Sequence, residues 1–367
     1  MAQQVRAMVL EAPERLVPRE FGLPEIHDDD GLLYLELAGI CHTDVGIFHG
    51  TTRYAMPLIM GHEIVGRIDR IGPLAARRWG VREGDRVAVE AIVRCGFCRA
   101  CVEGNYKYCR EGAGYGTFTP ADRPPYLWGA YSQYMYLAPG TSLLKLPEGV
   151  SAELGMLCTV AISNGLQWTV LKGGAKLGDA VVIQGVGPIG LSCVAAAKEA
   201  GAGPIIATGL RADAYRLKLA GEFGADHLVN VEEEDVVERV RELTGGDLAD
   251  VVVDVTGSGE AVRTSLKLVR PQGTLVSAGV TGDDTLTPLP LDTLLYKEIR
   301  LQGVFTFDNN AMRRALKLAQ RKKYPFEKLL THRFPLERAE EAVKTAGREL
   351  PSAEPIKVAL VPNQRGD

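Results

Sequence analysis

The pattern of hydrophobic and polar positions changes near the middle of the chain. Up to about Pro147, short β-like stretches of apolar and β-branched residues are separated by Gly, Pro and Asp, which predicts a β-rich domain with irregular loops. The expected strands in this half cover residues 5–10, 32–38, 64–71, 86–92 and 131–138.

Beyond about Ala180, apolar runs of strand length alternate with amphipathic runs of helical length. Strands are expected at residues 181–184, 205–207, 227–231, 250–255 and 274–278, and helices at residues 188–200, 212–223, 232–243 and 260–269. Such alternation favours right-handed crossovers and a parallel sheet with helices on both faces. A doubly wound α/β domain is therefore predicted.

The last part of the chain fits the doubly wound pattern poorly. Its expected elements are helices at residues 310–320 and 336–346 and a closing strand at residues 356–361. We therefore assign it to the first domain, which would comprise residues 1–157 and 305–367, with residues 158–304 forming an inserted α/β domain. A cleft between two such lobes is where a small-molecule site is expected.

Composition and charge narrow the choice of partner and location. The 367 residues are 46% hydrophobic and 24% charged, which is typical of a soluble globular protein with room for two domains. A net charge of -4 with scattered basic residues indicates neither a nucleic acid nor an anionic membrane as partner. The N-terminal stretch lacks a basic and then apolar leader, so a cytoplasmic location is expected. The odd number of cysteines, seven, favours reduced thiols over a disulfide framework.

Four of these cysteines lie in one short stretch with a C-x2-C-x2-C-x7-C spacing. They are Cys95, Cys98, Cys101 and Cys109. Four thiolates this close in sequence can surround one tetrahedral zinc ion, and a site with four protein ligands leaves no position for a substrate. The motif therefore predicts a structural zinc site and places the chemistry elsewhere.

A glycine-rich turn lies between the first expected strand and helix of the α/β half. Residues 184–190 contain G-x-G-x-x-G, in which Gly185 allows the turn, Gly187 admits a pyrophosphate and Gly190 allows close packing. The free N–H groups of the helix that starts at Pro188 and Ile189 favour an anion. We expect dinucleotide binding here, and the alternative is a turn that serves packing alone.

The end of the next expected strand bears on which dinucleotide binds. NAD-binding folds place Asp or Glu there to bind the ribose 2'-hydroxyl, but this chain has Gly209, which leaves space, followed by Arg211. Arg211 and Arg216 could pair with a 2'-phosphate, which favours NADP(H) over NAD(H). The alternative is that both arginines are solvated residues of the helix start and that Asp213 binds the ribose.

A second set of potential zinc ligands is spread along the chain. Cys41 and His62 lie in separate loops of the β-rich half, and Cys158 lies at its junction with the α/β half. Three protein ligands that leave a fourth position open are what catalytic zinc requires. A single buried Cys is more often a small core residue, so the prediction depends on their joint occurrence.

These motifs together resemble the zinc-dependent alcohol dehydrogenases of the medium-chain dehydrogenase/reductase family over essentially the full length. The resemblance is carried by Cys-His-Thr-Asp at 41–44, Gly-His-Glu at 61–63, the four-cysteine stretch and the glycine turn at 185–190. It implies a GroES-like catalytic domain, an inserted Rossmann domain and two zinc ions per chain. It also implies hydride transfer between an alcohol and a nicotinamide cofactor, giving a ketone or aldehyde.

The resemblance also assigns roles to residues around the catalytic zinc. Cys41, His62 and Cys158 would bind the metal, and Glu63 would lie beside it as an outer or transient ligand. Asp44 would orient the ring of His62.

Three further residues receive roles in proton transfer and cofactor binding from the same resemblance. Thr43 would take the proton of the alcohol, and His42 and Lys357 would lie near the cofactor diphosphate. Many members of the family pass the proton on through a histidine five residues after the first cysteine, but this chain has Gly46 there. His49 falls at a different place in the pattern and is no simple substitute, so the proton relay would end in water.

The substrate is only partly indicated. Phe48, Leu127, Trp128 and residues 304–307 suggest a secondary or bulky alcohol if they line the pocket, but aromatic residues are as often part of a core. Alternatives are an NAD(H)-dependent polyol or sugar dehydrogenase, a zinc-free quinone-reductase-like relative and a non-catalytic zinc-binding module. Members of the family form dimers or tetramers, often by pairing the edges of their cofactor sheets, so a homodimer or homotetramer is expected.

Overall fold

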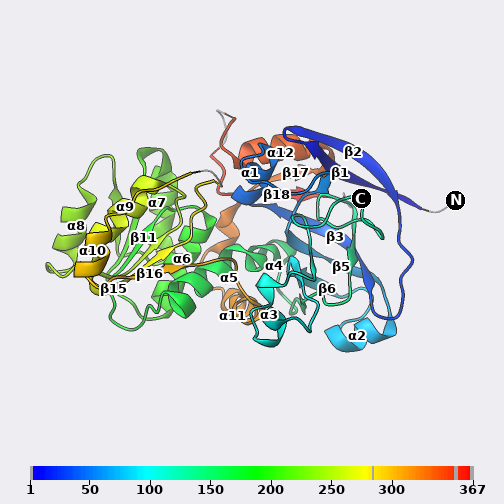
Figure 1. Ribbon diagram of the computed structural model, residues 1–367, viewed down its shortest axis with the longest axis horizontal. Helices are drawn as coiled ribbons and strands as arrows, with labels where there is room; N and C mark the ends of the chain where they lie inside the picture. Colours follow the sequence, from blue (N-terminus) through cyan, green and yellow to red (C-terminus); the bar gives the residue numbers. More distant parts are fainter. Residues whose placement is uncertain (1–2, 283–284, 351–353, 364–367) are drawn as a thin grey trace. The chain divides into compact units, whose positions relative to one another are not determined.

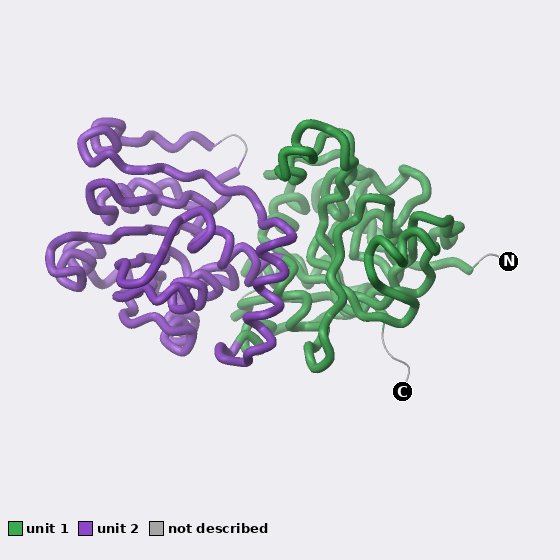
Figure 2. Tube along the Cα trace, turned by 90° about the horizontal axis from the view of Figure 1, so that it is seen from below, with its two compact units in different colours: residues 1–159, 326–367 green, residues 160–325 purple. Residues whose placement is uncertain are grey.

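The computed structural model describes residues 3–282, 285–350 and 354–363, and the chain divides into two compact units (Figures 1 and 2). Unit 1 comprises residues 1–159 and 326–367, and unit 2 comprises residues 160–325. The interrupted order of unit 1 agrees with an inserted α/β domain. The expected second boundary differs, because residues 305–325 belong to unit 2, where the helix they carry packs against α5 (Ala161–Leu166).

Unit 1 is built on β-sheets. A mainly antiparallel sheet has the order β10-β6-β5-β3-β18-β17, with β9 paired to β3, and a small sheet has the order β2-β1-β4. The strands are β1 (Gln4–Ala12), β2 (Arg15–Gly22), β3 (Gly31–Ile40), β4 (Leu58–Ile59), β5 (Glu63–Ile71), β6 (Arg86–Val89), β9 (Tyr134–Leu137), β10 (Leu143–Lys145), β17 (Leu330–Pro335) and β18 (Lys357–Val361), with a short pair of β7 (Ile92–Val93) and β8 (Ala113–Gly114).

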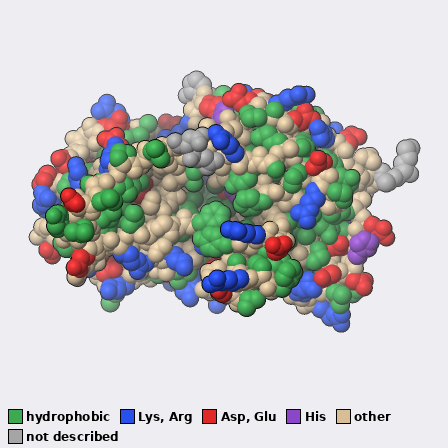
Figure 3. Space-filling view, in the orientation of Figure 1, with side chains coloured by type: hydrophobic (Ala, Val, Ile, Leu, Met, Phe, Trp, Pro, Cys, Tyr) green, Lys and Arg blue, Asp and Glu red, His purple; other side chains and the backbone are tan. Residues whose placement is uncertain are grey.

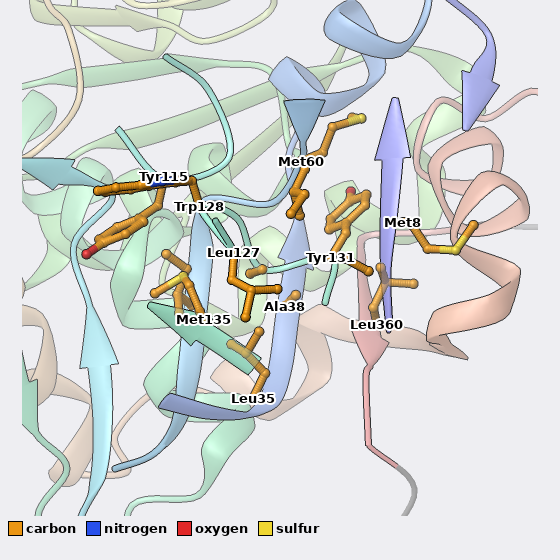
Figure 4. Packing of buried hydrophobic residues seen from close by; sticks show 14 of the residues in the cluster. Met8, Leu35, Ala38, Met60, Tyr115, Leu127, Trp128, Tyr131, Met135 and Leu360 are labelled. Carbon is orange, nitrogen blue, oxygen red and sulfur yellow. The ribbon is translucent and has the colours of Figure 1, made fainter. Parts of the chain in front are cut away.

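Short helices border these sheets. They are α1 (His42–Phe48), α2 (Pro73–Trp79), α3 (Arg99–Val102), α4 (Ala152–Thr159) and α12 (Ala339–Ala346). The strand β18 comes from the end of the chain and pairs with β3, so the C-terminal segment is a part of this unit as the sequence predicts. Its core packs apolar side chains from both sheets, among them Leu35 and Ala38 of β3 and Met135 of β9 (Figure 4).

Unit 2 is a doubly wound α/β domain. Its parallel sheet has the order β13-β12-β11-β14-β15-β16, with the switch point beside the first strand. The strands are β11 (Val181–Gln184), β12 (Ile205–Gly209), β13 (His227–Asn230), β14 (Ala249–Asp254), β15 (Val269–Ser277) and β16 (Arg300–Gly303). Each residue of β11 is buried, as expected of a parallel strand that is covered on both faces.

The helices of unit 2 follow the strands in alternation. They are α5 (Ala161–Leu166), continued by the π-helical segment η2 (Gln167–Lys172), then α6 (Pro188–Glu199), α7 (Ala214–Glu222), α8 (Val236–Leu243), α9 (Gly259–Leu268), α10 (Leu291–Tyr296) and α11 (Asn309–Gln320). In unit 2, α6 packs against β11 and β12, and α9 packs against β14 and β15. The predicted α/β fold class is confirmed.

No single helix among the described residues is long and apolar enough to cross a membrane. The bent pair Ala152–Thr159 and Ala161–Lys172 meets that test together on length and composition alone.

Candidate functional site

The ends of three neighbouring strands in unit 1 bring the candidate catalytic residues together. β3 ends at Ile40 directly before Cys41, Gly39 pairs with Glu63 at the start of β5, and Val358 of β18 pairs with Ile40. Because of these pairings, segments that lie some 20 and 300 residues apart in sequence meet where these strands end, at one edge of the sheet.

Helix α1 begins at this edge, and its first turn is organised by polar contacts. Cys41 precedes the helix as its N-cap, and its backbone N–H donates to Asp44 Oδ2 at 2.7 Å. Thr43 Oγ1 lies 3.7 Å from Cys41 Sγ. A short polar side chain at the third helical position commonly satisfies a free N–H in this way, and here it also fixes Cys41 and Thr43 beside each other.

Cys41, His62 and Glu63 converge on one point. One ligand atom from each lies within 4.8 Å of the other two. His62 Nδ1 lies 3.4 Å from Asp44 Oδ1, and the Asp44 side chain is fully buried. Burial lowers the pKa of His62, but the negative charges of Asp44 and Cys41 outweigh it and hold that pKa well above its usual value. Burial raises the pKa of Cys41, and the contact with His62 outweighs this and lowers it, which favours a thiolate.

This donor set fits a zinc ion. A thiolate, an imidazole and a carboxylate are the three kinds of protein ligand that zinc takes, and a carboxylate beside the ring orients a metal-binding histidine. Among the residues that the structure describes, Asp44 Oδ1 and His62 Nδ1 have no hydrogen-bond partner besides their 3.4 Å contact with each other. The group therefore has the composition of a catalytic metal site, with Asp44 in the orienting position that the sequence predicts.

Cys158 lies near this edge but outside the group of three. It sits in α4, a helix that packs against β3 and β5, and its side chain is fully buried. It takes no part in a disulfide, and burial raises the pKa of its thiol. It does not belong to the group of atoms that lie within 4.8 Å of one another. Its role as a zinc ligand stays a prediction.

Glu63 is held by a buried ion pair that the sequence does not reveal. Lys357 Nζ donates to Glu63 Oε1 and, at 2.9 Å, to the carbonyl of Ile40. The two charged side chains are 5% and 0% exposed. Lys357 was expected near a cofactor diphosphate, but the structure places its ammonium against Glu63, and a diphosphate contact would require it to leave this pair. A side chain at Gly39 would collide with the Glu63 carboxylate.

At Gly46, where many members of the family have the relay histidine, neighbouring side chains leave little space. A Cβ atom at Gly46 would lie 2.7 Å from Thr52 Oγ1 and 3.3 Å from Thr51 Oγ1, so no side chain fits there without displacing Thr52. His49 follows α1 and contacts Glu14 at 2.7 Å and Glu349 at 2.8 Å through its two ring nitrogens. Both of its ring nitrogens are therefore engaged by carboxylates, and that His49 is no simple substitute for the relay histidine stays a prediction.

The four-cysteine stretch forms a compact cluster of thiols. All four sulfur atoms lie within 4.8 Å of one another, with Cys95 and Cys101 at 3.8 Å and Cys98 and Cys109 also at 3.8 Å. Four sulfurs about 2.3 Å from a tetrahedral zinc ion would be about 3.8 Å apart, whereas a disulfide bond is only about 2 Å long. The geometry fits one structural zinc ion.

The glycine turn of unit 2 has the geometry that its motif predicts. Gly185 has a φ of 97°, which disfavours other residues. A Cβ at Gly190 would overlap the Gly185 carbonyl oxygen, so a side chain is excluded there. At Gly187, the N-cap of α6, a Cβ would meet no atom within 4 Å. Pro188 and Ile189 then form the first turn of the helix. Open space before a helix N-terminus suits a diphosphate.

The end of β12 differs from the sequence interpretation. Gly209 is buried, and the space expected beyond its Cα is filled, since a Cβ would lie 3.0 Å from Val186, 3.2 Å from Leu217 and 3.3 Å from Asp213. The expectation of free room at Gly209 is therefore wrong, and the reason is close packing against the helix that follows.

Both arginines near this strand end carry acidic partners. Arg211 Nε lies 3.2 Å from Glu233 Oε1, and its backbone N–H donates to Glu232 at 2.6 Å. Arg216 lies 3.6 Å from Asp213. The Arg211 side chain is 73% exposed, so it can change partner, whereas Arg216 is 15% exposed.

Of the remaining residues, His42 is exposed at the start of α1. Phe48, Leu127 and Trp128 are buried in the core of unit 1 and pack rather than line an open pocket. Sequence reasoning missed Tyr131, whose buried ring lies against Gly61. The only signal for it in the sequence is its place in an expected strand.

Known proteins resemble this chain along its whole length. Residues 27–148 match the family described as alcohol dehydrogenase GroES-like domain, and residues 188–321 match the family described as zinc-binding dehydrogenase. A probable alcohol dehydrogenase of Mycobacterium tuberculosis is 44% identical over 364 residues, which is 98% of each chain. This chain belongs to the zinc-type alcohol dehydrogenases of the medium-chain family. It is an oxidoreductase that acts on an alcohol or polyol.

Other members of the family show a range of substrates and cofactors. An erythritol/L-threitol dehydrogenase of Mycolicibacterium smegmatis is 30% identical over 98% of each chain. The crystal structure of an alcohol dehydrogenase from Thermotoga maritima has a TM-score of 0.89 at 29% identity and covers 99% of this chain and 100% of its own. A putative zinc-binding dehydrogenase from Sinorhizobium meliloti, bound to NADP, has a TM-score of 0.86 at 27% identity and covers 98% of this chain and 100% of its own.

Proposed function

We propose that this enzyme interconverts a secondary or bulky alcohol and its ketone or aldehyde, with NADP(H) as hydride carrier and two zinc ions per chain. The observation that carries the proposal is the convergence of Cys41, His62 and Glu63 within 4.8 Å, with Asp44 behind the histidine. Cys158 is proposed as a further ligand of the same zinc, and the four-cysteine cluster as the structural site.

The residues of the catalytic site divide the work of the reaction. Zinc bound at Cys41 and His62 supplies Lewis-acid polarisation of the substrate oxygen. Asp44 fixes the ring of His62, and the Lys357 ion pair restrains Glu63 beside the site. A bound nicotinamide would supply the hydride chemistry.

Thr43 handles the proton in this proposal. Its hydroxyl, 3.7 Å from Cys41 Sγ, accepts the alcohol proton as it donates its own to the next acceptor, because a hydroxyl cannot hold an added proton. One helical turn along, Gly46 offers no side chain and the Thr52 hydroxyl fills the space. The proton therefore passes to water near α1.

The ligand assignment is tested by replacing Cys41 with Ser. We expect zinc content to fall from two ions to one per chain and turnover to vanish, while the circular dichroism spectrum stays that of the folded protein. Cys193→Ser is the matched control, because it makes the same change at a buried thiol of α6 that belongs to neither candidate metal group. Retained activity in Cys41→Ser would contradict the proposal.

The choice of NADP(H) is supported by the exposed guanidinium of Arg211 at the end of β12, the strand position that bears the cofactor ribose in this fold. Glu233 and Asp213 oppose it, since they already pair with Arg211 and Arg216. We expect Arg211→Gln to lower kcat/KM with NADPH by one to two orders of magnitude, roughly the 1.5–3 kcal/mol of a charge-assisted bond, and to change kcat/KM with NADH little.

The control for this comparison is Arg241→Gln, which removes an arginine on α8 that pairs with Glu238. A clear preference of the unmodified enzyme for NADH would contradict the cofactor proposal and favour Asp213 as the ribose partner. A panel of ketones, aldehydes and polyols then separates the bulky-alcohol proposal from a polyol dehydrogenase, which the erythritol/L-threitol relative makes the second candidate.

We also propose that two copies of the chain form a dimer in the cytoplasm by pairing their β16 strands. β16 is the last strand of the sheet order in unit 2, and exposed apolar side chains lie on it and on α10. They include Leu291, Leu295, Tyr296 and Leu301. The seven unbridged cysteines suit a reducing compartment.

A further inference from the structure

Tyr131 is fixed in the middle of unit 1, next to the segment that carries His62. Its backbone N–H donates to the carbonyl of Met60 at 2.9 Å, and its carbonyl accepts from Met8 at 2.8 Å. Figure 4 shows its ring between Met60, which follows β4, and Met8 of β1. A Cβ at Gly61, which has a φ of 93°, would lie 2.5 Å from the Tyr131 ring. The ring therefore packs directly on the backbone that leads into His62.

The hydroxyl of this ring is buried without a partner. Tyr131 is 0% exposed, and its oxygen has no hydrogen-bond partner among the described residues. Burial, together with the negative charges of Asp44, Glu63 and Cys41, raises the pKa of the hydroxyl well above its usual value. A phenol hydroxyl is an O–H donor, and a buried donor without an acceptor costs free energy.

The same cluster holds acceptor atoms that lack donors. Asp44 is fully buried, and its Oδ2 accepts from the N–H of Cys41 at 2.7 Å. Within the described part of the chain, its Oδ1 has no donor closer than the 3.4 Å contact with His62. Glu63 Oε2 also lacks a partner, but that carboxylate is already held by Lys357 through its other oxygen. Of the two carboxylates, Asp44 is therefore the one whose second oxygen would accept a further donor.

We propose that Tyr131 is a positioning residue of the catalytic metal site, whose hydroxyl donates to Asp44 Oδ1, directly or through one bridging water, when Cys41 and His62 hold the metal. The inference rests on the proposed function. With two donors, the buried Asp44 carboxyl group is held in place as the acceptor for the ring N–H of His62, and the ring keeps the orientation that metal binding needs.

The change that tests this is Tyr131→Phe, which removes one oxygen and keeps the ring against Gly61. The probe is Zn2+ or Co2+ alone, added to enzyme whose four-cysteine site is filled and titrated against a chelator. We expect the metal affinity of the Cys41 and His62 site to fall by about tenfold, the lower end for loss of an outer hydrogen bond, and the Co2+ absorption bands to shift. Affinity at the four-cysteine site should not change.

Stability of the enzyme without catalytic metal provides the second readout. Because the Tyr131 hydroxyl has no partner there, Tyr131→Phe should leave the urea midpoint unchanged or raise it. Tyr115→Phe is the matched control with the opposite expectation, since the Tyr115 hydroxyl contacts Thr141 at 2.7 Å and accepts from the Ala138 N–H at 2.8 Å. That control should lower the urea midpoint and leave metal affinity unchanged.

Each result of these titrations decides the inference. If Tyr131→Phe binds catalytic metal as tightly as the unmodified enzyme, the inference is overturned and the proposed function stands. If the unmodified enzyme takes up no metal at Cys41 and His62, both fail. In a double-mutant cycle with Asp44→Asn, losses that are not additive support the contact with Asp44, and strictly additive losses overturn it.

Discussion

At the residue scale, Lys357 and Glu63 form a deeply buried ion pair in unit 1. Both side chains are at most 5% exposed, and Lys357 comes from the last strand of the unit. Removing one member of a buried pair leaves an uncompensated charge and costs about 3–5 kcal/mol, whereas removing both costs far less.

We expect Lys357→Met to lower the free energy of unfolding by about 3–5 kcal/mol, measured by urea denaturation at neutral pH. Adding Glu63→Gln should recover most of the loss, because the orphaned charge disappears. Lys145→Met is the control, since Lys145 is 51% exposed in its pair with Asp85 and should cost less than about 1 kcal/mol. If Lys357→Met and Lys145→Met lower the free energy of unfolding equally, the pair of Lys357 and Glu63 does not behave as a buried ion pair.

Residue identity predicts part of the site from sequence. Cys41, His62 and Glu63 are chemically suited to zinc, and the structure brings all three together. The partner of Lys357 could not be predicted, because Lys357 and Glu63 are 294 positions apart and come together through the pairing of β3 with both β18 and β5. Apart from its place in an expected strand, Tyr131 could not be singled out, because tyrosine is common in cores and its proposed role depends on one atom.

At the scale of elements, His49 connects α1 to two other segments of unit 1. Its ring nitrogens contact Glu14, in the turn after β1, and Glu349, beyond α12, while Lys344 of α12 lies over the neighbouring Phe48 ring. Only a protonated imidazole can donate from both nitrogens. The hydrogen bonds to Glu349 and Glu14 accordingly raise the pKa of His49, despite some opposing burial.

The sign of the pH effect follows from this raised pKa. In the unfolded chain a histidine has a pKa near 6.5. The contribution of protonated His49 to the free energy of unfolding is therefore fully present below about pH 6.5, and it is lost as pH rises through the higher pKa of the folded state. We expect His49→Gln to remove this decline in unfolding free energy, measured by urea denaturation between pH 5.5 and 8.5. His227→Gln on β13 is the control. If the unfolding free energy of His49→Gln still declines over this pH range, groups other than His49 cause the decline.

The alternation of strands and helices in unit 2 could be predicted because buried parallel strands read as short apolar runs. Boundaries set by side-chain caps were less visible, and α8 starts at Val236 rather than residue 232 because Asp235 accepts from the N–H groups of Val237 and Glu238. β16 escaped prediction because Arg300–Gly303 is a short, largely exposed edge strand with a mixed sequence.

At the scale of the whole molecule, charge does not single out a binding site on the face shown in Figure 3. Acidic and basic side chains are intermixed on the face shown in Figure 3, in keeping with a net charge of -4. Exposed apolar residues of unit 2 are more unevenly placed, and several lie on α10 and β16 at one edge of the sheet. An exposed edge strand beside apolar side chains favours association with another strand.

Pairing of β16 with its copy about a two-fold axis would satisfy its open backbone groups and cover α10 in both subunits, because such an interface uses the same patch twice. Leu295 on α10 is 68% exposed, and Leu295→Glu would place a charge in each half of that interface. We expect the molar mass from size-exclusion chromatography with light scattering to fall from a dimer or tetramer toward half of its value. Leu177→Glu, at a leucine that is 83% exposed before β11, should leave the mass unchanged. If the unmodified enzyme is a monomer at micromolar concentration, or if Leu295→Glu keeps its full mass, this edge is not the interface.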